Sequence, residues 1–344
     1  MGFGQIAFLG SGETSRAGGA IFEHLARSLP DRPRIAVLET PAGFELNSNQ
    51  VAGRVADFLR SRLQNYNPVV DVIPARKRGT AFSPDEREIL RPLAFANFIF
   101  MGPGSPTYAI RQLQGSLAWD LIRARHRLGA ALAFASSATI AVGAWALPVY
   151  EIYKVGEDVH SARGLDLFGA FGTELSFIPH WNNAEGGDDV DTSRCFVGME
   201  RFAIWCNSLP AENTTVGLDE HTGLIIDFEK RTCLVNGVSS VSLVRDCDPR
   251  IYPAGASFPL SELGTLHLPE LPESGISPRA WEMATNASQP MDLSPGPDVL
   301  ALAAQRQQAR LNGNWGESDR LRAKIAELGW NIQDTKDGQQ LARR

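Results

Sequence analysis

The sequence predicts an α/β fold in which helices sandwich a mainly parallel sheet, followed by a small helical hairpin. Two observations lead to this prediction. Short apolar runs alternate with amphipathic stretches through the first 150 residues, and the run 131–135 is unbroken, as expected for a parallel strand buried on both faces. Strands that alternate with helices form a parallel sheet. The predicted strands are 5–9, 34–38, 69–73, 97–101 and 131–135.

Amphipathic patterns between these strands predict the helices that cover the sheet, at 18–28, 48–63, 84–93 and 106–127. Two of them open with a Ser-Pro pair, Ser83-Pro84 and Ser105-Pro106, in which serine suits the N-cap and proline the first helical position. Further along the chain, three strand-like pieces predict antiparallel additions to the sheet, at 175–178, 223–227 and 238–244.

The last hundred residues divide differently. Nine prolines fall between Pro249 and Pro297, which disrupts most helices, so this stretch is interpreted as an extended linker lying partly on the main domain. From Asp298 the pattern is helical to the end of the chain. The predicted domains are therefore 1–248 and 298–344, with a linker at 249–297.

Composition limits the class of protein. The 344 residues carry a net charge of −6, which argues against nucleic acid as a general partner of the surface. The four cysteines show no C-x-x-C spacing, so neither a zinc site nor a disulfide framework is expected. We expect no metal and no cofactor. The first residues lack the features of a signal peptide and no run is long enough to span a membrane, so a cytoplasmic protein with no membrane partner is expected.

The strand 131–135 ends in two serines, and a helix is predicted to start at Ala138. A serine at an abrupt strand-to-helix corner presents its hydroxyl above the sheet beside a helix N-terminus, which suits a nucleophile. The alternative is a buried turn whose serine only caps the helix. Ser137 is the predicted nucleophile. Among the six histidines, His180 starts a polar loop directly after a predicted strand, where catalytic groups tend to lie, whereas His160 and His221 are weaker candidates.

Four motifs resemble peptidase family S51, which contains aspartyl dipeptidase and cyanophycinase and has the class I glutamine amidotransferase-like fold, a flavodoxin-like parallel sheet. The motifs are the glycine loop 101–105, the nucleophile corner 135–139, the Pro-His-Trp segment 179–184 and the segment 217–224. The resemblance spans about residues 5–245. It implies a serine hydrolase that cleaves a small peptide or amide through an acyl-enzyme.

Carried over residue by residue, the resemblance makes Ser137 the nucleophile and His180 the general base. It places the acidic member nearest Glu151, with Glu157 and Asp158 as alternatives. The backbone amides of Gly104 and Ala138 would form the oxyanion hole.

The corner departs from the family pattern. Ala135 and Thr139 replace its two glycines, although the strand and helix backbones approach closely there. Pro103 removes a possible backbone donor from the glycine loop.

Two arginines, Arg194 and Arg201, follow the histidine loop at places where the family also has arginines. They are candidate ligands for a substrate carboxylate. The alternative is that both are surface arginines on a helix.

Residues 298–344 resemble the small C-terminal domain of cysteinyl-tRNA synthetase, through elements at 309–315, 318–322 and 328–338. This resemblance implies transfer RNA as a partner. The segment has eight Lys/Arg against six Asp/Glu, a weak charge for an RNA-binding domain, which favours a packing or homo-oligomerisation module. We expect 301–328 to form two antiparallel helices joined at 312–314 and packed on the main domain or on a second subunit, with Trp315 and Trp330 as the anchors of that packing. The functions that compete with the hydrolase are a non-catalytic binding protein on the same fold and a tRNA-associated protein.

Overall fold

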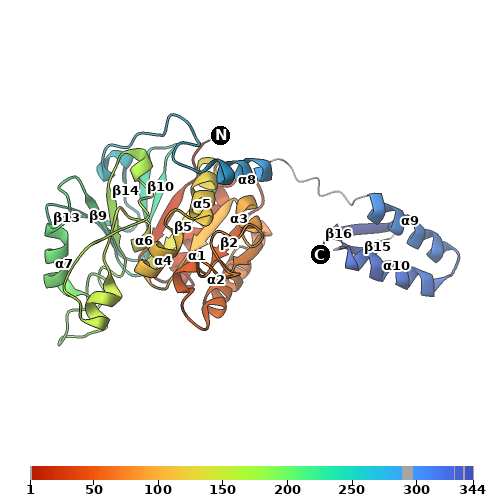
Figure 1. Cartoon of the computed structure of the whole chain (residues 1–344), viewed down its shortest axis with the longest axis horizontal. Coiled ribbons are helices and arrows are strands. Elements are labelled where there is room, and N and C mark those ends of the chain that lie inside the picture. The colour runs from red at the N-terminus through yellow and green to blue at the C-terminus, as the bar shows by residue number, and fades with distance from the viewer. Residues whose placement is uncertain (1, 289–296, 329, 336–337, 344) are drawn as a thin grey trace. The chain divides into compact units, whose positions relative to one another are not determined.

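The computed structural model describes residues 2–288, 297–328, 330–335 and 338–343, which fall into two compact units, Met1–Ser288 and Gln289–Arg344 (Figure 1). Among the described residues, no helix is both long and apolar enough to cross a membrane.

The first unit is built on an eight-stranded sheet in the order β14-β11-β10-β1-β5-β4-β2-β3. The five strands from β1 to β3 in this order are parallel, and β10, β11 and β14 extend the sheet antiparallel beyond β1. Their bounds are β1 Ile6–Leu9, β2 Arg34–Leu38, β3 Val69–Ile73, β4 Phe98–Met101, β5 Ala131–Ala135, β10 Thr222–Asp227, β11 Thr232–Gly237 and β14 Ser257–Pro259. The predicted α/β class with a parallel central sheet is confirmed.

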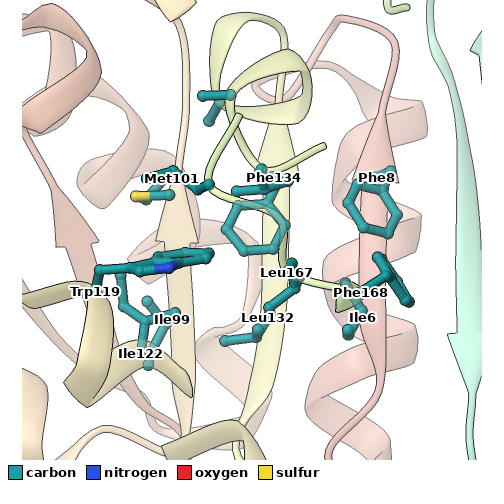
Figure 2. Close-up of a cluster of buried hydrophobic side chains, with 14 of the residues drawn as sticks. Ile6, Phe8, Ile99, Met101, Trp119, Ile122, Leu132, Phe134, Leu167 and Phe168 are labelled. Atoms are coloured by element: carbon teal, nitrogen blue, oxygen red, sulfur yellow. The ribbon is translucent and has the colours of Figure 1, made fainter. Parts of the chain in front are cut away.

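The central strands are buried on both faces because their alternate side chains enter two separate cores. Ile6 and Phe8 of β1 and Leu132 and Phe134 of β5 point into the first core, which Figure 2 shows together with the buried ring of Trp119. The intervening residues, such as Ala133 of β5, face the second core. Apolar side chains at every position follow from this two-sided burial.

Helices α1 (Arg16–Ser28) and α2 (Ser48–Arg62) fill the second core, on one face of the sheet. The first core, on the other face, contains residues of α4 (Pro106–Leu113) and α5 (Leu117–Arg127), and of the second sheet. That sheet has the order β13-β12-β9-β8. Its strands are β8 Leu175–Ile178, β9 Thr214–Leu218, β12 Ser240–Arg245 and β13 Asp248–Pro253. The other α-helices described in this unit are α3 Arg91–Phe95, α6 Ser137–Ala141, α7 Gly198–Asn207 and α8 Pro278–Ser288.

Two predicted helices differ from the observed ones. The pattern at 106–127 is divided into α4 and α5, because Gly115 adopts φ 65° and Ser116 accepts a hydrogen bond from Trp119 N as the cap of a new helix. The pattern at 84–93 is mostly turn, with α3 forming only at its end. Ser83 therefore caps a turn, since its hydroxyl accepts a hydrogen bond from Asp85 N.

The predicted linker 249–297 is corrected for its described part, which belongs to the first unit. It contains most of β13 and all of β14 and α8, and prolines are compatible with the edge strands and the helix start where they occur. Two buried arginines of α5 hold this segment through its carbonyls. Arg127 Nη1 donates to Pro272 O at 2.7 Å, and Arg125 Nη1 donates to Ala284 O at 3.1 Å. The predicted boundary at 248 is therefore too early, and 289–296 lies outside the described residues.

The second unit contains the expected pair of helices, α9 (Pro297–Leu311) and α10 (Trp315–Glu327). A hairpin of β15 (Trp330–Thr335) and β16 (Gly338–Arg343) follows, so the prediction of helix to the end of the chain is wrong. The small core contains Ile325 and Ile332, and buried Arg306 donates to Gln339 Oε1 at 2.9 Å, which ties the hairpin to α9. Trp330 packs against this core.

A buried histidine of α5 makes the stability of the first unit depend on pH. His126 is fully buried with Nε2 2.9 Å from Gly4 O, and burial lowers its pKa to about 4. At pH values between the unfolded pKa of 6.5 and the folded pKa of about 4, His126 is protonated in the unfolded chain but not in the native one. The free energy of unfolding therefore falls as the pH falls through this range. The full loss is about 3 kcal/mol.

Replacing this histidine with a neutral donor should flatten that dependence. We expect His126→Gln, whose amide can still donate to Gly4 O, to lose less stability than the wild type when the pH is lowered from 7 to 4.5. Urea unfolding at a series of pH values measures the difference. Parallel profiles for the two proteins would contradict the assignment.

Candidate active site

Ser136 forms the corner between β5 and α6. It has φ 52° and ψ −121°, a conformation that costs free energy for a residue with a side chain and that is typical of a serine raised above a sheet at a strand-to-helix turn. Its N–H donates to Leu9 O at 3.3 Å, which fixes the corner to the end of β1. The hydroxyl of Ser136 lies 3.1 Å from Nε2 of His180.

Ser137, the predicted nucleophile, does not lie at the corner but one residue after it. Ser137 is the first residue of α6, only 4% exposed, and its hydroxyl donates to Gly102 O at 3.2 Å instead of reaching His180. The corner falls at the residue that directly follows the last strand residue, Ala135, and that residue is Ser136. The structure thus brings His180 together with a half-exposed serine, whereas the buried serine braces the glycine loop.

The imidazole of His180 is held on its other side by Glu220, whose Oε1 lies 2.8 Å from Nδ1. The pairing follows from the second sheet, in which β8 and β9 are parallel and Ile178 is in register with Gly217. His180 and Glu220 come shortly after the ends of β8 and β9, so they lie at the same edge of this sheet. An ionised carboxylate only accepts hydrogen bonds, so Nδ1 carries the proton and Nε2 accepts from Ser136 Oγ.

Main-chain and side-chain bonds fix both members of this pair. His180 N donates to Gly10 O at 3.1 Å, so the end of β1 anchors the histidine as well as the serine. Asp219, which is buried, accepts hydrogen bonds from Ser239 Oγ and Ser240 N at 2.6 and 3.0 Å and so fixes the turn that carries Glu220.

The electrostatics of the site keep the acid ionised. Burial by itself would raise the pKa of Glu220, but hydrogen bonds from His180 and from Asn183 Nδ2, at 3.0 Å, outweigh it and the pKa is lowered. The nearby thiol of Cys195 is unsuited to be the nucleophile. Burial, assisted by the charge of Glu220, raises the pKa of Cys195 to about 12, and a protonated thiol is a poor nucleophile.

The glycine loop after β4 packs tightly beside the corner. Gly104 has φ 148°, and a Cβ there would lie 2.0 Å from Pro41 O, so no larger residue fits. Ser105 N donates to Pro41 O at 2.9 Å and closes the contact between the loops after β2 and β4. With Ser136 at the corner, the residue after the serine is Ser137, so Ser137 replaces Ala138 as the expected oxyanion donor. Gly104 stays a prediction.

Thr139, which takes the place of a family glycine in a pattern centred on Ser137, is accommodated without opening the corner. It is fully buried, and its hydroxyl is 2.9 Å from Phe134 O and 3.3 Å from Leu9 O, so it links the first turn of α6 to β5 and β1. The departure at this position therefore strengthens the corner. The close approach expected two residues after the serine falls at Ala138, which is small.

The predicted acid, Glu151, lies elsewhere. Its Oε1 accepts a hydrogen bond from Thr107 Oγ1 at 2.5 Å, at the start of α4, and it makes no contact with His180 there. The two alternatives, Glu157 and Asp158, are exposed, and Oε2 of Glu157 lies 3.8 Å from Nε2 of His160. Glu220, and not Glu151, is therefore the carboxylate that meets His180, because the parallel strands of the second sheet bring β9 and not the segment after α6 beside the histidine.

Arg194 has a structural partner. Its Nη1 donates to Trp181 O at 2.8 Å and its guanidinium lies 3.8 Å from the centre of the Trp181 ring. Arg201 lies exposed on α7. The structure does not bring either arginine to the serine, so their assignment to a substrate carboxylate stays a prediction.

Sequence reasoning missed Ser136 and Glu220, although signals for both were present. The strand 131–135 was placed correctly, and the residue directly after it is Ser136. A corner centred on Ser136 has Ala138 two residues later and Phe134 two residues earlier, whereas one centred on Ser137 has Thr139 and Ala135. Glu220 lies within the segment 217–224 that was noted as a motif without a role.

Removing the charge of Glu220 should change the acid stability of the protein. Because its folded pKa lies below the ordinary 4.5, its contribution to stability is complete above that value and is lost as the pH falls through the folded pKa. We expect Glu220→Gln to have a lower melting temperature at pH 7 and a smaller further loss between pH 6 and 3 than the wild type. Glu229→Gln, at an exposed carboxylate, is the matched control. Equal acid profiles for wild type and Glu220→Gln would contradict the hydrogen bond between Glu220 and His180.

Comparison with protein families and curated proteins concerns mainly the C-terminal unit. Residues 295–341 match the model of the cysteinyl-tRNA ligase anticodon binding domain family. A cysteine–tRNA ligase of Azotobacter vinelandii is 33% identical over 150 residues, which cover 41% of this chain and 30% of the ligase. Another, of Methylocella silvestris, is 50% identical over 40 residues, or 12% of this chain and 9% of the ligase. The chain thus spans less than a third of the length of these relatives.

Comparison with solved structures concerns the fold of the larger unit. A peptidase from an acI-B1 actinobacterium aligns with a TM-score of 0.59 and 20% identity, over 75% of this chain and 97% of the peptidase. The likeness confirms the fold. The similarities expected from the sequence, to peptidases and to the C-terminal part of cysteinyl-tRNA synthetases, are therefore both found.

Proposed function

We propose that the first unit is a serine hydrolase that cleaves a small peptide or amide, with Ser136 as nucleophile, His180 as general base and Glu220 as the orienting acid. The observation that carries the proposal is the hydrogen-bonded series from Ser136 Oγ to His180 Nε2, at 3.1 Å, and from His180 Nδ1 to Glu220 Oε1, at 2.8 Å. A nucleophile, a base and an orienting group in this order form the arrangement that activates a serine.

The reaction follows from this arrangement. Ser136 Oγ attacks the substrate carbonyl while its proton passes to His180 Nε2, and Glu220 stabilises the imidazolium. The backbone N–H of Ser137, with that of Gly104, stabilises the oxyanion. His180 then gives its proton to the amine nitrogen as the carbon–nitrogen bond breaks, and the acyl group remains on Ser136 as an ester. A water molecule, deprotonated by His180, hydrolyses that ester and restores the serine.

The adjacent serines supply a matched test of the nucleophile. A fluorophosphonate probe should add to wild type and to Ser137→Ala, but not to Ser136→Ala, and His180→Ala should label much more slowly. Intact mass spectrometry measures the added group and peptide mapping locates it. Labelling of Ser136→Ala at residue 137 would return the role to Ser137. Absence of labelling in every variant, with no turnover of a dipeptide panel, would favour a non-catalytic binding protein.

A second candidate function belongs to the C-terminal unit, for which we infer transfer RNA as the partner. The match to an anticodon binding domain over 295–341 favours it. Trp315 supports it, because the side chain is 60% exposed within this unit. Arg310 lies 5.4 Å from the Trp315 ring. An exposed aromatic ring beside an arginine can stack on an unpaired base.

Removing this unit should separate the two functions. We expect full-length protein to bind bulk transfer RNA with an affinity that falls as salt rises, and a chain ending at Gly296 to lose binding while keeping fluorophosphonate labelling. Trp315→Ala should weaken binding in the full chain. Filter binding at two salt concentrations measures these effects. Equal retention by the truncated chain, or no binding by the full chain, would leave packing or oligomerisation as the role of the unit.

A further inference from the structure

A row of aromatic side chains begins at the candidate base. The ring of Phe196 lies 5.5 Å from the imidazole of His180, measured between centroids. Tyr153 stacks on Phe196 at 5.6 Å with an interplanar angle of 21°, and Tyr150 follows 6.0 Å from Tyr153. All three aromatic residues are half-buried, so part of each side chain faces solvent. Lys154 ends the row, with its ammonium 4.8 Å from the Tyr150 ring and 5.5 Å from the Tyr153 ring.

The backbone that carries Phe196 is strained. Arg194, Cys195 and Phe196 have φ values of 59°, 62° and 71°, a run of three left-handed residues none of which is glycine. Such residues usually occur singly because each costs free energy. Strain of this kind persists where surrounding contacts enforce it, and it gathers at functional sites.

Contacts on both sides enforce this conformation. Cys195 N donates to His180 O at 3.1 Å, and Phe196 N donates to Thr192 O at 2.9 Å. Arg194 is held against Trp181, as described above, and the Cys195 side chain is buried. The strained segment thus places the ring of Phe196 beside the imidazole of His180, at the candidate site.

The position of this ring determines which part of a substrate it can meet. In the proposed reaction, His180 Nε2 delivers a proton to the departing amine, so the residue that carries that amine must lie next to the imidazole. A side chain on that residue is then within reach of Phe196 and Tyr153. Burial of an apolar side chain against them removes apolar surface from water, and an aromatic side chain adds a ring contact.

We propose that Phe196 and Tyr153 form a subsite for an apolar, preferably aromatic, side chain on the residue that leaves with the amine. The subsite rests on the proposed hydrolase function and deepens it by naming the substrate class: short peptides with an aromatic residue after the scissile bond.

Paired dipeptides test the subsite without knowledge of the residue before the bond. The probes are the twenty Xaa-Phe dipeptides and the twenty Xaa-Gly dipeptides, compared at the same Xaa. For wild type we expect kcat/KM to favour Phe over Gly by about 10-fold or more, the effect of burying one ring. Phe196→Ala should bring the ratio close to one, Tyr153→Ala should reduce it, and Phe196→Leu should restore part of it. Tyr66→Ala, at a half-buried tyrosine after α2, is the control that keeps the ratio.

Binding separates failure of the subsite from failure of the proposed function. The same dipeptides are titrated calorimetrically into Ser136→Ala, because a binding measurement needs no catalysis. Tighter binding of Xaa-Phe than of Xaa-Gly without turnover by wild type would support the subsite and refute the hydrolase. Turnover with equal ratios in wild type and Phe196→Ala would refute the subsite and keep the hydrolase. Equal binding of both series at every Xaa would also refute the subsite.

Discussion

The carbonyl groups at the end of β1 hold the candidate site together. Leu9 O accepts from the backbone of Ser136 and Gly10 O accepts from the backbone of His180, so one strand end positions the proposed nucleophile and the proposed base. The serine comes from the main sheet and the histidine from the second sheet, and β1 lies beside β5 in the first. A side-chain hydrogen bond of 3.1 Å between groups from two sheets requires such a common anchor.

The inner strands of the central sheet, such as β5, could be predicted from the sequence because burial on both faces leaves an unbroken apolar run. Strands β2, β3, β5 and β8 have the predicted bounds. The site was predicted only in part. His180 could be found because it directly follows a strand, but two adjacent serines differ by a single left-handed residue, which hydropathy does not show. Glu220 lies 40 residues beyond His180, and only the pairing of β8 with β9 brings the two together.

In the C-terminal unit, the helices and the similarity to a known family could be predicted from the sequence, but the strands could not. Its two helices were predicted from their spacing, and the similarity to cysteinyl-tRNA ligases is found over nearly the whole unit. The hairpin of β15 and β16 was missed because its strands mix polar and apolar residues without a clear period. The hairpin completes the small core, since Ile332 packs with Ile325 and Arg306 bonds to Gln339. The ligase-like unit thus depends on strand residues that the helical pattern alone does not include.

The division of the candidate triad between two sheets bears on how the protein fails when heated. Catalytic hydrogen bonds tolerate shifts of only about half an ångström, whereas sheets packed through side chains can slide by more before their own strands separate. A small slip of the second sheet would carry His180 and Glu220 away from Ser136 together, as a pair, without breaking a strand. Turnover by the proposed hydrolase would then be lost at a lower temperature than the circular dichroism signal of the strands, and it would return on cooling.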